Sequence, residues 1–224
     1  MKLCLAATTA AILAAAPAAL AAPTLNPDPV KSCYRDREPV NLLGGGFTPN
    51  GTVTIARNGV PLSPTLTVDS AGSFLAQLKL AQGSGQSRRT YTATDSANSM
   101  LVAPTALTVS AIEVKVRPDT GTPGKVLRIG ARGFTDGTTL YAHIVRKKKP
   151  RTIRIGRLKG ACAKLVARKR LFAANAPLGT YRVQFDTKRK YDPGREVRYG
   201  FTVVVSMTAE PAAAAAGLWR RDRG

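Results

Sequence analysis

Beyond its first twenty-one residues, the chain is a succession of short β-branched or alternating segments separated by glycine, proline, asparagine and aspartate. None of them repeats its apolar residues at the three- and four-residue spacing of a helix, whereas a period of two is typical of strands buried on one face. Predicted strands cover residues 40–43, 52–57, 65–68, 74–80, 90–94, 106–109, 113–116, 126–131, 138–145, 152–155, 181–185 and 197–205. Several short strands at this spacing predict an all-β, antiparallel sandwich architecture.

Two strands carry further detail. Asn50-Gly51 and Asn58-Gly59 supply positive φ angles for tight hairpin turns on either side of the strand 52–57. The strand 138–145 alternates, so one face is expected in the core and the other outside it. The two faces carry Leu140, Ala142 and Ile144, and Tyr141, His143 and Val145.

A phrase occurs twice in the chain, as Gly46-Phe47-Thr48-Pro49-Asn50-Gly51 and as Gly133-Phe134-Thr135-Asp136-Gly137. A second repeated segment follows each phrase. It runs from Thr90-Tyr91 to Asp95 in the first copy and from Thr180-Tyr181 to Asp186 in the second. Self-similarity at a fixed period of about 87 residues indicates tandem domains. We expect the glycine to let the backbone bend, the phenylalanine to fill the core, and the tyrosine to form a tyrosine corner.

The repeat and the composition set the expected organisation. Residues 22–29 contain three prolines and predict a flexible lead. Residues 30–110 are expected to form a first β-sandwich domain and residues 111–206 a second, basic one. Residues 207–224 contain an alanine run and Trp219 among arginines, which predicts a disordered or weakly helical tail.

Residues 1–21 have the pattern of a secretory signal peptide. Lys2 precedes an apolar run from Leu3 to Ala16, and Ala19-Leu20-Ala21 places small residues at the cleavage site. The apolar run is too short to span a bilayer stably, although an uncleaved anchor is the alternative. The expectation is a bacterial protein that is secreted or associated with the cell envelope, with no transmembrane span after cleavage.

The chain resembles the immunoglobulin-like repeats of bacterial secreted and surface proteins, especially those of the early-set or TIG-like kind. The resemblance lies in the turn Gly46-Phe47-Thr48 and its copy Gly133-Phe134-Thr135, each of which is followed by a strand, in tandem units behind a signal peptide. This resemblance implies β-sandwich modules for adhesion, carbohydrate binding or spacing, with no shared catalytic residues. Neither copy has the internal cysteine pair and tryptophan of antibody domains, since Trp219 lies outside both.

Positive charge is concentrated in the second copy. Residues 111–206 hold twenty-three Lys and Arg against six Asp and Glu, a net +17 of the total +21, whereas residues 22–110 hold seven against five, a net +2. Repulsion among neighbouring like charges favours an anionic partner. The predicted polyanion-binding residues are Arg146, Lys147, Lys148, Lys149, Arg151, Arg154, Arg157, Lys159, Arg168, Lys169, Arg170, Lys188, Arg189 and Lys190, with Pro150 at a hairpin tip.

An exported chain first meets the envelope, so the expected partner is an acidic polymer such as teichoic acid or an acidic polysaccharide. Nucleic acid is disfavoured, because single strands need aromatic platforms beside the basic groove and no zinc-finger, RNP or helix-turn-helix spacing occurs. One alternative is a basic surface that serves only solubility or the protection of strand edges. The other is a spacer or adhesion protein with a protein partner, bound through strand edges or the Trp219 tail.

The residues for catalysis are few, so a non-enzymatic protein without cofactor or metal is expected. His143 is the only histidine, which excludes zinc sites built from several histidines. Cys33 and Cys162 remain after cleavage, and an even number in an exported chain favours a disulfide between the two copies; two unrelated thiols are the alternative. A Cys-dependent enzyme using Cys162 and His143 is the distant alternative. Asp95 and Asp186 stand at equivalent places and are expected to cap turns.

Overall fold

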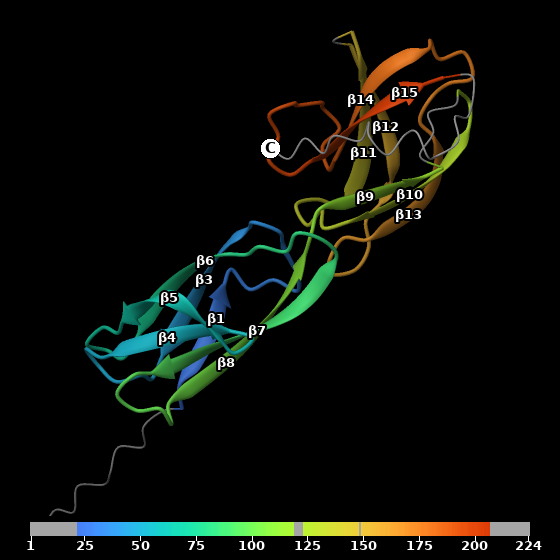
Figure 1. Ribbon diagram of the computed structural model, residues 1–224. Coiled ribbons are helices and arrows are strands. Elements are labelled where there is room, and N and C mark those ends of the chain that lie inside the picture. Colours follow the sequence, from blue (N-terminus) through green and yellow to red (C-terminus); the bar gives the residue numbers. More distant parts are fainter. Residues whose placement is uncertain (1–21, 119–122, 148, 207–224) are drawn as a thin grey trace, which may run out of the picture.

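The computed structural model describes residues 22–118, 123–147 and 149–206, and every regular element in this part of the chain is a β-strand. The strands form two sandwiches arranged end to end (Figure 1). The described residues contain no helix that is long and apolar enough to cross a membrane. The expected signal peptide and C-terminal tail lie outside the described residues.

The first domain is a sandwich of a three-stranded and a five-stranded sheet. Its strands are β1 (Thr24–Asp28), β2 (Tyr34–Arg35), β3 (Pro39–Gly45), β4 (Thr52–Arg57), β5 (Val60–Thr67), β6 (Phe74–Lys79), β7 (Gln86–Asp95) and β8 (Val102–Ser110). The sheets have the orders β1-β3-β6 and β2-β8-β7-β4-β5, antiparallel except for the parallel pair of β2 and β8. Their inner faces enclose one apolar core that includes Leu42, Val53, Phe47 and Leu107.

The second domain repeats this division. Its strands are β9 (Glu113–Arg117), β10 (Val126–Arg132), β11 (Thr139–Arg146), β12 (Lys149–Arg157), β13 (Leu165–Arg170), β14 (Gly179–Asp186) and β15 (Tyr199–Val205). They form sheets of order β13-β10-β9 and β12-β11-β14-β15. In both domains the first, second and fifth main strands make one sheet and the remaining strands the other, which is the topology of immunoglobulin-like sandwiches. The all-β, tandem immunoglobulin-like prediction is therefore confirmed.

The strand predictions succeed where alternation or turn residues mark the strand. Thr52–Arg57 is found with the predicted bounds, and Leu140, Ala142 and Ile144 all lie in the core. Asn58 and Gly59 both have positive φ and close the tight turn between β4 and β5. Asn50 also has positive φ, but it connects β3 to β4 across the two sheets, so the prediction of a hairpin there is wrong.

Three strands were missed. The expected flexible lead contains β1, which pairs along its whole length with β3 and places Leu25 in the core. Pro27 disguises it in the sequence, but β1 is an edge strand, where a residue without an N–H is tolerated. β2 has only two residues, and in β13 the consecutive charges Arg168-Lys169-Arg170 hide the alternation of a strand.

The repeated phrase has the expected structural role. Gly46 and Gly133 have φ of 79° and 82°, and the phenylalanines that follow them are buried in the two cores. The Tyr181 hydroxyl donates a 2.7 Å hydrogen bond to the carbonyl of Pro177, four residues upstream. This is the bond that defines a tyrosine corner.

Asp95, at the end of β7, ties the repeated phrase to the loop after the strand. Its buried carboxylate accepts hydrogen bonds from the backbone N–H groups of Thr48 at 2.7 Å, Ala97 at 2.8 Å and Asn98 at 3.0 Å. Burial by itself raises the pKa of Asp95, but the hydrogen bonds outweigh burial and the net pKa is lowered. The expected turn-capping role is confirmed, and the structure adds the bond to Thr48.

This carboxylate makes stability depend on acidity. Because the folded pKa lies below the unfolded value of about 3.9, its contribution is fully present above that pH and is lost as pH falls through the folded pKa. We expect Asp95→Asn to lower the free energy of unfolding by about 2 kcal/mol at pH 7, since the amide nitrogen then faces the Thr48 N–H. The variant should also lose stability less steeply than the native protein in urea unfolding between pH 5 and 3. Parallel pH profiles would contradict this role.

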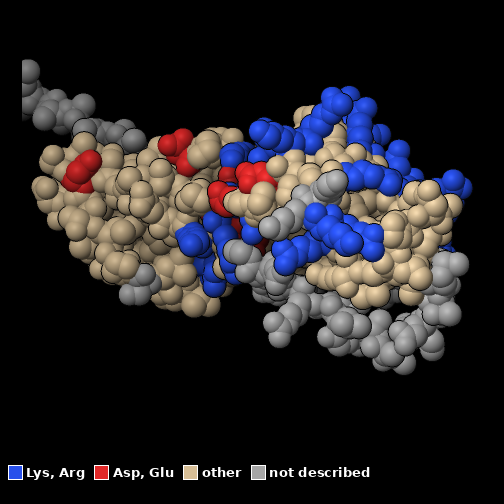
Figure 2. All heavy atoms as spheres, turned by 90° about the horizontal axis from the view of Figure 1, so that it is seen from above, with Lys and Arg blue, Asp and Glu red and all other residues tan. Residues whose placement is uncertain are grey.

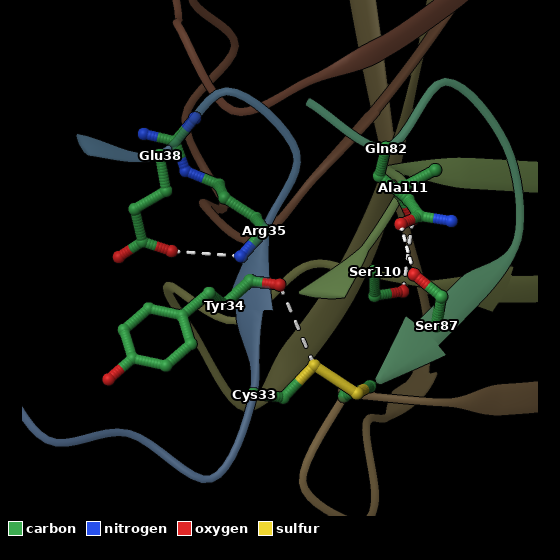
Figure 3. The surroundings of a disulfide bond; sticks show 9 residues. Cys33, Tyr34, Arg35, Glu38, Gln82, Ser87, Ser110 and Ala111 are labelled. Atoms are coloured by element: carbon green, nitrogen blue, oxygen red, sulfur yellow. Dashed lines mark hydrogen bonds between the residues drawn. A yellow bond between two sulfur atoms is a disulfide. The ribbon is translucent and has the colours of Figure 1, made fainter. Parts of the chain in front are cut away.

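Two features join the domains at their junction. A disulfide links Cys33, just before β2, to Cys162, in the loop between β12 and β13 (Figure 3). Arg35 forms an ion pair with Glu196 of the loop between β14 and β15 at 2.6 Å. A cleft of about 470 Å³ lies beside this ion pair and is also lined by Arg37, Glu113 and Arg198. The predicted cysteine pairing is therefore present.

Candidate polyanion-binding surface

The outer face of the sheet β13-β10-β9 carries three arginines in one row across the strands. Arg128 of β10 is directly opposite Arg117 of β9 and directly opposite Arg168 of β13. All three side chains are exposed. Since neighbouring strands are about 4.8 Å apart, the row of Arg117, Arg128 and Arg168 (the arginine row) spans about 10 Å of the sheet.

Strand alternation explains why these side chains point outward. In β10, Leu127 and Ile129 are buried in the core, so Arg128 between them faces solvent. In β9, Val114 is buried and the exposed side chains are those of Lys115 and Arg117. Successive side chains of a strand point to opposite faces, so the apolar core positions determine the outward position of the arginines.

The arginine row has no carboxylate partner among the residues that the structure describes. Among the described residues, no carboxylate lies within ion-pair distance of Arg117, Arg128 or Arg168. Like charges directly opposite one another on a sheet are destabilising. An anion bound over the row therefore relieves a cost that the folded protein otherwise carries.

The predicted hairpin cluster is partly structural. A tight turn that includes Lys147 joins β11 and β12, with Arg146 opposite Lys149. Pro150 pairs with Val145 within the strands, so its prediction at the tip is wrong. Arg146 donates a 2.9 Å hydrogen bond to the carbonyl of Leu178 and lies over the Tyr181 ring at 5.5 Å. Lys148 lies outside the described residues.

The other predicted basic residues fall into two places. β12 and β13, the edge strands of the two sheets, lie in contact. They bring together exposed residues of two clusters that are separate in sequence, namely Arg151, Arg154, Arg157, Arg168, Lys169 and Arg170. Lys159 lies in the turn after β12. Lys188, Arg189 and Lys190 follow β14 at the end of the sheet opposite the hairpin and do not join the arginine row. Figure 2 shows Lys and Arg gathered over the second domain and at the junction.

The sequence prediction missed Arg117, Arg128, Arg132, Lys115 and Lys164. It grouped basic residues that are consecutive in sequence, whereas these alternate with apolar residues or stand alone. The alternation in Val114-Lys115-Val116-Arg117 was a usable signal for an outward basic face. The alignment of Arg117 with Arg128 and Arg168 depends on strand pairing and has no sequence signal.

The hypothesis of a catalytic Cys162 and His143 is wrong. The Cys162 sulfur is bonded to Cys33 and is not available as a nucleophile. His143 is completely buried beneath the loop after β14, in contact with the Tyr191 ring. Its Nε2 lies 3.2 Å from Asp186 Oδ1 and 3.0 Å from the Lys188 carbonyl oxygen, so we assign the proton to Nε2.

Asp186 is a buried hydrogen-bond acceptor in the same network. Its carboxylate accepts bonds from the Gln184 amide at 2.7 Å and from the Lys188 N–H at 2.8 Å. Burial raises the pKa of Asp186, but the bonds from His143, Gln184 and Lys188 outweigh burial and lower it. The network fixes the start of the loop that carries Lys188, Arg189 and Lys190, which is a structural role.

No protein-family profile and no curated protein sequence matches the chain. Similar solved structures include Salmonella alpha-2-macroglobulin reacted with methylamine, with a TM-score of 0.39 and 12% identity over 81% of this chain and 16% of that chain. Native E. coli alpha-2-macroglobulin gives a TM-score of 0.38 and 11% identity over 82% and 16%. Red sea bream transglutaminase gives 0.30 and 12% over 84% and 32%. The chain thus spans about a sixth of the macroglobulins.

Proposed function

We propose that this protein is a non-enzymatic binding protein of the bacterial cell envelope whose second domain binds an acidic polymer. The observation that carries the proposal is the arginine row, in which strand pairing aligns three exposed guanidinium groups that have no ion-pair partner within the described ranges. A guanidinium presents several donors in a planar fork that matches phosphate and carboxylate oxygens. Three such groups in a line favour a polymer with repeated anions over a single small anion.

The position of the row supports this function over a role in protecting strand edges. Lysines and arginines that protect a sheet lie on its edge strands. Arg128, however, lies on β10, the central strand of its sheet, where no free edge exists. The disulfide between Cys33 and Cys162 is consistent with an extracytoplasmic location, because disulfides persist in oxidising compartments.

Replacing Arg117, Arg128 and Arg168 together with glutamine tests the proposal. If the native protein makes about five anionic contacts, the logarithm of its affinity for a polyanion should fall with log salt at a slope near −4. The triple variant should retain a slope of about −2 and bind roughly a hundredfold more weakly at low salt. Titration of immobilised poly(glycerol phosphate) at several salt concentrations measures both quantities.

The matched control also removes three charges, by Lys147→Gln in the hairpin turn and Arg189→Gln and Lys190→Gln in the loop after β14, which lie away from the row. These exposed residues have no hydrogen-bond partner among the described side chains, so the control should fold and bind nearly as well as the native protein. A native slope near zero would contradict polyanion binding and favour the spacer function. Loss of binding in the control with retention in the row variant would move the site to the hairpin turn and the loop after β14.

A further inference from the structure

A trough crosses the outer face of the sheet β13-β10-β9 beside the arginine row. Its floor is Gly130, which has no side chain and lies directly opposite Lys115 and Val166. The arginine row lies on one side of the trough, two residues away along β10 and outside the lining of the cavity over Gly130. Arg132 and Lys164 lie on the other side. The cavity measures about 260 Å³, and its charged lining residues are Glu113, Lys115, Arg132 and Lys164. The trough thus has basic groups on both sides.

The dimensions of the trough select a thin ligand. Arg128 and Arg132 are four residues apart on β10, which places their backbones about 13 Å apart at 3.3 Å per residue. Side chains on both walls narrow this width further. A nucleic-acid duplex is much wider than its own major groove, which is about 12 Å wide, so a duplex cannot enter the trough. A single extended chain can lie across the three strands.

The lining also limits the chemistry of the ligand. Glu113 lies near one end, where it pairs with Arg132 at 2.9 Å and with Lys115 at 3.4 Å. Anions are consequently held mainly by the arginine row, while the Glu113 carboxylate can accept bonds from hydroxyl groups. The described lining contains no aromatic side chain on which a base could stack. Val166, 66% exposed, supplies an apolar contact at the opposite end.

We infer that the trough binds one unbranched phosphodiester chain of the poly(alditol phosphate) type, lying across β9, β10 and β13. Its phosphates contact the arginine row and its hydroxyl-bearing links lie over Gly130. Such a chain carries its charge in a narrow backbone and needs no stacking platform. This inference rests on the proposed function and names the ligand class and its path.

Gly130→Val tests the path without changing charge. A Cβ at Gly130 has only the Lys115 carbonyl oxygen nearby, at 3.9 Å, and its φ is not in the left-handed region. A β-branched residue suits a strand. The variant should fold, bind poly(glycerol phosphate) about tenfold more weakly and keep the native salt slope. The matched control is Gly200→Val on β15, where the nearest atom is 4.0 Å away; its affinity should not change.

A second pair of variants tests the path in case Gly130→Val does not fold. Val166→Glu places a negative charge at the trough, whereas Val204→Glu places one at a similarly exposed position on β15. Only Val166→Glu should weaken binding, by about tenfold. If Gly130→Val has a lowered melting temperature, this pair decides the path.

Each outcome supports or overturns one statement. Unchanged affinity in Gly130→Val and Val166→Glu, with binding lost in the arginine triple variant, would overturn the trough and leave the proposed function standing. Unchanged affinity in Gly130→Val, Val166→Glu and the arginine triple variant would overturn both the trough and the proposed function. If a DNA duplex binds as tightly as poly(glycerol phosphate), the single-chain path is overturned. If single-stranded oligothymidylate or poly-glutamate binds as tightly as poly(glycerol phosphate), the ligand class is overturned while polyanion binding stands.

Discussion

Replacement of both Cys33 and Cys162 by serine is expected to lower the free energy of unfolding by about 4–5 kcal/mol. The two cysteines are 129 residues apart in sequence and lie in different domains. When one domain unfolds while its neighbour stays folded, the disulfide and the linker at Ala111 together hold the unfolded segment as a closed loop. Removing the disulfide frees that segment and increases the conformational entropy of the unfolded state.

Urea unfolding followed by circular dichroism measures the total change, and hydrogen exchange of core amides separates the two domains. Both domains should lose protection, since either one is tethered when the other remains folded. Thiol titration of the native protein, unfolded without reductant, is the control and should show no free thiol from this pair. A change below about 1 kcal/mol would contradict restraint by loop closure.

Gly133→Ala is expected to destabilise the second domain by about 3–4 kcal/mol, the sum of two separate costs. Gly133 has a φ of +82°, which costs an L-residue about 1–2 kcal/mol. A Cβ there would also lie 2.2 Å from the carbonyl oxygen of Ala111, in the linker between the domains. This atom is backbone and cannot rotate away, so the strain of a forced fit is added to the cost of φ.

Gly59→Ala is the matched control, because Gly59 has the same φ of +82° and a Cβ at this position would have no atom within 4 Å. It should cost only about 1–2 kcal/mol, the part due to φ alone. Urea unfolding of both variants gives the difference, which reports the collision with Ala111. Equal destabilisation would show that the linker moves away without cost.

Much of the fold was predictable because it follows from local chemistry. Asn58-Gly59 can adopt the positive φ angles of a tight turn, and alternation in the strand from Thr139 to Arg146 identifies its buried face. The duplicated glycine and phenylalanine indicated two cores. β1 and β13 were missed because an edge strand tolerates proline and consecutive charges, so that its sequence resembles a loop.

The candidate site was predictable only in part. The net charge predicted an anion-binding surface in the second copy, and Arg168 belonged to a predicted cluster. The runs at Arg146 and Lys188 drew attention because they are dense in sequence. Density along the chain is not density on a surface, since Arg146 is anchored to Leu178 and the Lys188 segment follows β14 elsewhere.

The sequence by itself determined the all-β class, the two tandem domains, the concentration of charge in the second and the two cysteines that could pair. Each follows from composition or from patterns within a few residues. Only the tertiary structure decided that Cys33 reaches Cys162, that His143 is buried beneath a loop, and that Arg117, Arg128 and Arg168 form one row beside Gly130. The physical reason is strand register, which brings together residues far apart in the chain and is determined by the packing of the whole core.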